Sequence, residues 1–202
     1  THFRSNPSQF GETPFGFPKA GAYRVQFLLE SLADLRQSLQ AKGSDLVIRK
    51  GKPEDEIPQI AAALKVDAVY WHEEVTSEEL AVDRAVEKAL AAQKISNEVY
   101  WGATLYHPDD LPFEVSRLPE VFTQCRKKVE KGSTVAPIFP TPDKLPTLPE
   151  IEPGELPTIQ HLGLEPNAID DRGVLPFTGG ETAGLERLQH YFWKADRLKV
   201  YK

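Results

Sequence analysis

The sequence predicts an α/β fold with a Rossmann-like, doubly wound parallel sheet, and two observations support this prediction. Short apolar segments at 45–51, 66–72 and 97–102 have the length and composition of buried strands. Between them, residues 54–65 and 76–93 carry apolar side chains at helical spacing. Strands and helices that alternate in this way are joined by right-handed crossovers, which place the strands parallel in one sheet.

Three further helices are predicted outside this series. Apolar residues recur every three or four positions over 22–41, which predicts a long helix with one buried face. A shorter helix is predicted at 120–132. The segment TGGETAG (178–184) favours the start of another helix, with Thr178 or Gly179 near its N-cap. It lacks the glycine and lysine spacing of a phosphate-binding loop.

A proline-rich stretch divides the chain into three predicted parts. The stretch from 133 to 158 holds most of the prolines that follow residue 132, and this density excludes helix interiors and central strands. We therefore expect an α/β domain at 1–132, an extended linker at 133–176 and the start of a helical domain at 177–202.

Composition excludes several classes of protein. The formal net charge of −6 argues against a surface devoted to nucleic acid, although 126–131 carries a local basic patch. No apolar run approaches the ~20 residues that a membrane-spanning helix needs, and no signal peptide is recognisable. These observations predict a cytoplasmic protein that does not interact with membranes. The single cysteine, Cys125, excludes an internal disulfide.

The stretch WHEEVTSEEL (71–80) has two interpretations that the sequence leaves open. Thr76 and Glu79 have the spacing of a capping box, in which a threonine and a glutamate bond each other's backbone amides at a helix start. The same residues follow directly on a predicted strand, where ligands of open α/β sheets gather. Glu78 has no part in the box, so it tests the ligand interpretation more directly.

An aromatic stretch, YWGATLYHPDDLPF (100–113), follows the last predicted strand. Tyr100, Trp101 and Tyr106 could stack on a planar ligand, but packing at the rim of the sheet is the favoured interpretation. The aspartates and histidines show no metal-ligand spacing. No nucleophile, base and orienting group stand together, so no catalytic residue is predicted.

In combination and in this order, five segments resemble the photolyase/cryptochrome flavoproteins, and within them cryptochrome DASH. They cover most of the chain: FGFPKAGAYRVQFLLESLADLRQSL (15–39), YWHEEVTSEELAVDR (70–84), YWGATLYHPDDLPF (100–113), LPEVFTQCRKKVE (118–130) and FTGGETAGLERLQHYFWKADRLKVYK (177–202).

The resemblance implies part of a blue-light-driven DNA photolyase, a carbon–carbon lyase that repairs cyclobutane pyrimidine dimers, preferably in single-stranded DNA. It implies an α/β antenna domain whose 5,10-methenyltetrahydrofolate passes excitation energy to FAD in a helical domain. The family's folate-contacting pair matches Glu78 and Glu79, and its first FAD-contacting tyrosine matches Tyr201.

The family's opening strand, with its W-F-R-x-D-L-R-like motif, and most of its FAD domain have no counterpart in these 202 residues. We therefore expect an incomplete antenna domain that is inactive alone, with exposed sheet edges through which two copies could pair. Two alternatives stay open, a photosensory cryptochrome without repair activity and a nucleotide-binding α/β module.

Overall fold

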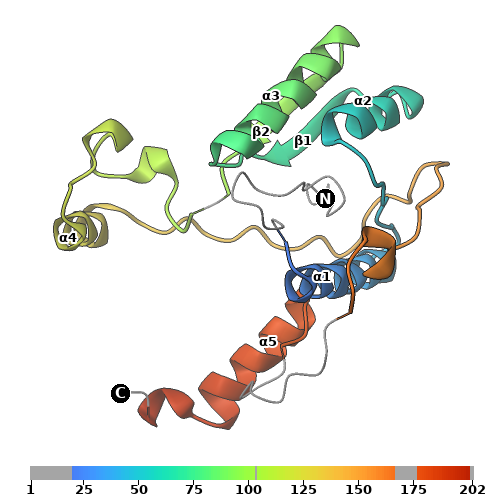
Figure 1. Cartoon of the computed structure of the whole chain (residues 1–202). Helices are drawn as coiled ribbons and strands as arrows, with labels where there is room; N and C mark the ends of the chain where they lie inside the picture. Colours follow the sequence, from blue (N-terminus) through green and yellow to red (C-terminus); the bar gives the residue numbers. More distant parts are fainter. Residues whose placement is uncertain (1–19, 103, 167–176, 201–202) are drawn as a thin grey trace. The chain divides into compact units, whose positions relative to one another are not determined.

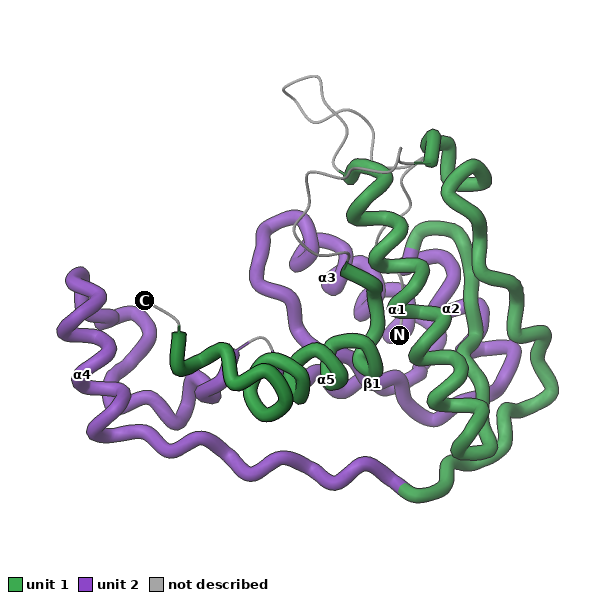
Figure 2. The backbone as a smooth tube through the Cα atoms, turned by 90° about the horizontal axis from the view of Figure 1, so that it is seen from below, with its two compact units in different colours: residues 1–52, 143–202 green, residues 53–142 purple. Residues whose placement is uncertain are grey.

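The computed structural model describes residues 20–102, 104–166 and 177–200 (Figure 1). The described residues form two compact units, one within 1–52 and 143–202 and the other within 53–142 (Figure 2). Within the described ranges, no helix is long and apolar enough to cross a membrane. The main elements are α1 (Ala22–Ala41), α2 (Pro53–Ala63), β1 (Ala68–His72), α3 (Ser77–Ala92), β2 (Ser96–Tyr100), α4 (Phe122–Gly132) and α5 (Glu181–Gln189).

The unit within 53–142 holds a parallel sheet of two strands. Strand β1 pairs with β2 in a register that runs from Ala68 opposite Ser96 to His72 opposite Tyr100. Helix α3 connects the two strands, and α2 precedes β1, so the order of elements is helix, strand, helix, strand. The predicted combination of helices with a parallel sheet is therefore confirmed.

The core of this unit lies between one face of the sheet and the two helices α2 and α3. Alternate residues of a strand point to opposite faces, which brings Trp71 of β1 and Val99 of β2 to the helical side. Helix α3 faces them with side chains at helical spacing. The buried members of this core are Ala61, Trp71, Val86 and Leu90.

The strand predicted at 45–51 is not formed. This segment has no strand partner among the described residues and instead runs beside the proline-rich stretch. The Ile48 amide donates to Pro153 O at 2.7 Å, and the Leu145 amide donates to Lys42 O at 2.9 Å. An apolar segment becomes a strand only where a neighbouring strand satisfies its backbone, so composition alone overestimated this one.

Side chains strengthen the contact between the 42–50 segment and the proline-rich stretch. Arg36 forms a 2.8 Å ion pair with Asp45, which lowers the pKa of that carboxyl, and also donates to Gly154 O at 2.9 Å. Gly154 has φ +79°, and a Cβ there would overlap Ile48 O. Only glycine combines this backbone conformation with so close an approach.

The start of α5 is held by two carboxylates of α1. Glu30 accepts from the Gly179 amide at 2.7 Å, and Asp34 accepts from the Thr182 amide at 3.2 Å. The N-cap of α5 is Gly180, which has φ +109° and no side chain to cap the helix. The Thr182 amide, one of those that a helix leaves unsatisfied at its N-terminus, is thus capped by another helix, and the Gly179 bond fixes the chain just before the N-cap.

The contact between Asp34 and α5 should weaken at low pH. Hydrogen bonds from Thr182 lower the pKa of Asp34 below its ordinary value of 3.8. A carboxyl whose pKa is lower in the folded than in the unfolded chain stabilises the folded state. This stabilisation is fully present at pH values above the unfolded pKa and is lost as the pH falls through the folded pKa. The amide proton shift of Thr182 should therefore titrate below about pH 4. Asp34→Asn should abolish this titration, and a flat wild-type curve would contradict the prediction.

Candidate ligand-binding turn at the carboxyl end of the sheet

The residues from Glu73 to Glu79, here called the acidic turn, lead from the end of β1 into the first turn of α3. The Glu73 amide donates to Tyr100 O at 2.9 Å, which continues the pairing of β1 with β2 for one more residue. The next amide, that of Glu74, lies 3.5 Å from Asp83 Oδ2 on α3. The backbone of the acidic turn is therefore attached both to the sheet and to the helix.

The predicted capping box at the start of α3 is not formed. Thr76 is the N-cap, as predicted, with extended backbone angles of φ −94° and ψ 155°. Its side chain makes no capping hydrogen bond, although its carbonyl accepts the helical bond from the Leu80 amide at 2.9 Å. The box requires bonds in both directions. The spacing of Thr76 and Glu79 therefore predicted the residue at which the helix starts but not the hydrogen bonds made there.

Glu78 and Glu79 both lie in the first turn of α3 but differ in exposure. Glu78 is exposed, whereas Glu79 is half-buried and its Oε2 atom is fully buried. Carboxylates in a first helical turn are stabilised by the positive end of the helix dipole. Ionised carboxylates act only as hydrogen-bond acceptors, so this turn is suited to a ligand that presents N–H groups.

Sequence reasoning missed Asp83, which is 5% exposed and is the only buried charged side chain in the described part of the chain. A signal for it was present, because Asp83 falls between Val82 and Val86 on the apolar stripe of α3. A carboxylate on such a stripe must satisfy a polar group within the protein.

The last residues of the two strands lie close to each other. His72 ends β1, and its imidazole lies against Gly102, just beyond β2, so closely that a Cβ at Gly102 would overlap Nδ1. Beyond Gly102, Thr104 Oγ1 accepts from Trp101 Nε1 at 2.7 Å. Glycine at 102 therefore allows the two segments that leave the sheet to approach each other.

Tyr100, one of the aromatic residues considered for ligand stacking, is 50% exposed and lies beside Tyr70 on one face of the sheet. Its ring stacks on Tyr70 with centroids 6.4 Å apart and an interplanar angle of 20°. Its hydroxyl donates to Glu98, and this bond raises the pKa of Tyr100. The packing interpretation that the sequence favoured therefore describes Tyr100.

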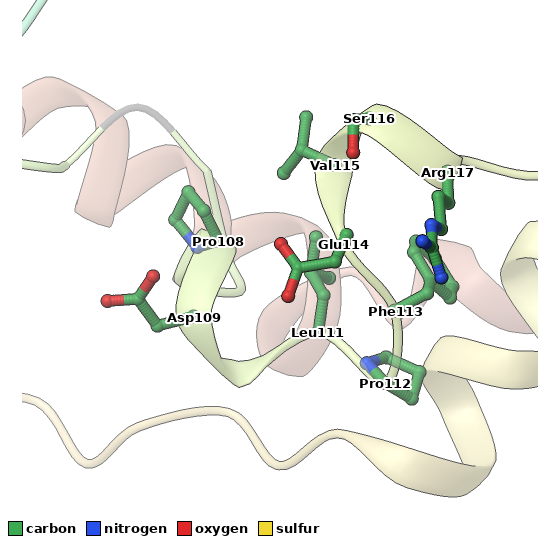
Figure 3. A pocket seen from close by; sticks show the side chains of 9 residues that line it. All are labelled: Pro108, Asp109, Leu111, Pro112, Phe113, Glu114, Val115, Ser116 and Arg117. Atoms are coloured by element: carbon green, nitrogen blue, oxygen red, sulfur yellow. The ribbon is translucent and has the colours of Figure 1, made fainter.

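A separate hollow of about 810 Å³ lies in the loop that precedes α4 (Figure 3). No predicted site residue lines it. Phe113 forms part of its wall, and the centroid of the Phe113 ring lies 5.9 Å from Lys128 Nζ of α4.

In the described ranges, no three histidine, cysteine, aspartate or glutamate side chains gather as a metal site. Tyr201, predicted to contact FAD, lies outside the described residues.

Residues 3–149 match the family model described as DNA photolyase. The chain belongs to the DNA photolyase family. It is 52% identical to a cryptochrome DASH from Gloeobacter violaceus, in an alignment that covers 98% of this chain and 39% of that protein. It is 46% identical to a cryptochrome DASH from Xenopus laevis, with 93% and 36% covered. The chain thus spans less than half the length of these relatives.

Solved structures of family members have the same fold. A Synechocystis cryptochrome superposes with a TM-score of 0.89 at 45% identity, covering 96% of this chain and 40% of that one. A class III photolyase from Agrobacterium tumefaciens superposes with a TM-score of 0.65 at 24% identity, covering 85% and 36%. The predicted resemblance to photolyases and cryptochromes is thereby confirmed.

Proposed function

We propose that this chain forms the light-harvesting antenna part of a cryptochrome DASH type of photolyase and holds 5,10-methenyltetrahydrofolate at the acidic turn. The full-length protein would use reduced FAD to split cyclobutane pyrimidine dimers, mainly in UV-damaged single-stranded DNA, as a deoxyribodipyrimidine photo-lyase in the cytoplasm. The observation that carries this proposal is the position of Glu78 and Glu79 at the carboxyl end of a parallel sheet.

The chemistry of the acidic turn fits the proposed pigment. The pterin ring of a folate presents an amino group and ring N–H groups along one edge, and carboxylates are their natural acceptors. Glu78 is open to solvent, so a ligand can reach it, whereas Glu79 is half-buried with its Oε2 atom enclosed. When bound, the folate would absorb near-UV and blue light and transfer its excitation energy to FAD.

A flavin is the main competing antenna pigment. An archaeal photolyase from Sulfolobus tokodaii was solved with two FAD molecules, with the implication of a novel light-harvesting cofactor. It superposes with a TM-score of 0.53 at 25% identity, covering 64% of this chain and 27% of that chain. Binding experiments should therefore include both folate and FAD.

Replacing Glu79 by glutamine should weaken folate binding about 10-fold or more, because a charge-assisted hydrogen bond contributes roughly 1.5–3 kcal/mol. The measurement is a titration of the full-length protein with 5,10-methenyltetrahydrofolate, followed by near-UV absorbance. Glu87→Gln is the matched control, because it removes the same charge from α3 outside the acidic turn. Equal affinities of the two variants would contradict the assignment of Glu79.

The function of the full-length protein needs a separate experiment. Repair of a dimer in single-stranded DNA under blue light supports the photolyase, whereas light-dependent signalling without repair supports the photosensory alternative. Tight binding of ATP in place of folate would favour the nucleotide-binding module. Each outcome supports a different one of the three functions.

A further inference from the structure

We propose that Asp83 is a positioning residue whose buried carboxylate fixes the acidic turn and so determines where Glu78 and Glu79 meet a ligand. The part of this inference that concerns a ligand rests on the proposed function. The part that concerns the turn rests on the contacts of Asp83 alone. Experiments on the two parts therefore fail independently.

Asp83 is a buried acid on the packed face of α3. Its side chain is 5% exposed on the face of α3 that also carries Val86 and Leu90. A buried carboxylate is unfavourable unless polar groups compensate for its lost hydration. An apolar residue at 83 would continue the stripe without this cost, so the carboxylate must satisfy a group that an apolar side chain would leave unsatisfied.

The backbone of the acidic turn provides such a group. Asp83 Oδ2 lies 3.5 Å from the Glu74 amide, at the long end for a hydrogen bond, and the negative charge strengthens the interaction. The preceding amide, that of Glu73, is held by Tyr100 O at 2.9 Å. Two successive amides of the turn are therefore attached to two different elements, β2 and α3.

This double attachment restricts the residues that follow. Only Val75, Thr76 and Ser77 separate the Glu74 amide from Glu78. Asp83 lies on the same helix as Glu78 and Glu79, so its bond to the Glu74 amide closes a loop of the chain that contains both glutamates. Without this bond, the acidic turn could move relative to α3 while the helix itself stays intact.

The first experiment measures the turn without any ligand. Amide hydrogen exchange of the chain is compared in wild type, Asp83→Asn and Asp83→Ala. Exchange of the Glu74 amide should become about 10-fold faster in Asp83→Ala, while exchange of the Glu73 amide, held by Tyr100 O, stays unchanged. Asp83→Asn keeps the shape and one oxygen acceptor, so its Glu74 amide should show a smaller increase in exchange, and it supplies the measurement if the alanine variant unfolds.

The second experiment measures 5,10-methenyltetrahydrofolate affinity and thermal stability of the same variants in the full-length protein. Val86→Ala is the control, because Val86 is 2% exposed on the same helix and makes no bond to the turn. Asp83→Ala should weaken folate binding several-fold more than Val86→Ala at a matched loss of stability. Asp83→Asn should restore part of the affinity.

Each outcome decides one part of the inference. An unchanged Glu74 amide in both Asp83 variants would overturn the attachment of the turn. If the Glu74 amide exchanges faster in Asp83→Ala but this variant binds folate no more weakly than Val86→Ala does, the positioning role is overturned. If the wild-type protein binds no folate, the proposed function fails, and the exchange data still decide whether Asp83 holds the turn.

Discussion

Replacing Leu90 by alanine should lower the free energy of unfolding of the sheet unit by about 2–5 kcal/mol, the range for large-to-small changes in a core. Leu90 is 0% exposed and belongs to a cluster with Ala61, Trp71 and Val86. Removing three carbon atoms there loses burial of apolar surface and leaves a cavity between α3 and the sheet. Because α3 also carries the acidic turn, its loss of packing should loosen that turn as well.

Denaturant unfolding, combined with hydrogen exchange of the α3 amides, measures this effect. Leu185→Ala is the matched control, because Leu185 lies on α5 and is 58% exposed. The control should change stability by no more than about 0.5 kcal/mol, as surface substitutions usually do. Similar losses for the two variants would show that Leu90 does not lie in a core.

The helices and their buried faces could be predicted from the sequence because they depend on local spacing. The predicted ranges 22–41 and 76–93 correspond to α1 and α3 within one residue at either end. Helical hydrogen bonds join residues four apart, so a segment's own pattern specifies both the helix and the side that packs. The parallel pairing of β1 with β2 followed from the helix between them.

Features that depend on distant parts of the chain could not be predicted in the same way. Residues 45–51 have strand-like composition, but their bonds are made with the proline-rich stretch about 100 positions later. The start of α5 is held by Glu30 and Asp34 on α1, and no local rule connects these residues with it. Sequence spacing indicates which groups need partners but not which distant groups supply them.

The place of Glu78 and Glu79 in the fold could be predicted from the sequence, but the hydrogen bonds around them only in part. Glu78 and Glu79 lie at the carboxyl end of β1 because the crossover topology places them there. The capping box was wrong, because Thr76 takes the extended backbone of an N-cap but its side chain makes no capping hydrogen bond, a choice of side-chain partner that spacing does not determine. A carboxylate within an apolar stripe was the available signal for Asp83, and it could have been read from the sequence.

Replacing Gly179 by alanine should destabilise the packing of α5 on α1 by about 1–3 kcal/mol, the usual cost of overpacking a contact that cannot expand. A Cβ at Gly179 would overlap Phe27 O, and its distance to Ser31 Oγ would be only 2.7 Å. Phe27 O belongs to the α1 backbone and accepts from that Ser31 hydroxyl at 2.7 Å, so it cannot move aside without disturbing the helix. The start of α5 must therefore shift, which also lengthens the bond from the Gly179 amide to Glu30.

Gly184→Ala is the matched control for Gly179→Ala and should have the opposite sign. Gly184 lies inside α5, and a Cβ there meets nothing within 4 Å. Alanine at such a position should stabilise the helix by about 0.5–1 kcal/mol, because glycine loses more conformational freedom on folding. The Thr182 amide donates a hydrogen bond to Asp34, so its rate of hydrogen exchange measures both effects at the same bond. Slower exchange in Gly184→Ala and faster exchange in Gly179→Ala would separate the effect of close backbone approach from that of helix propensity. A change of the exchange rate in the same direction in both variants would refute the close approach of α5 to Phe27.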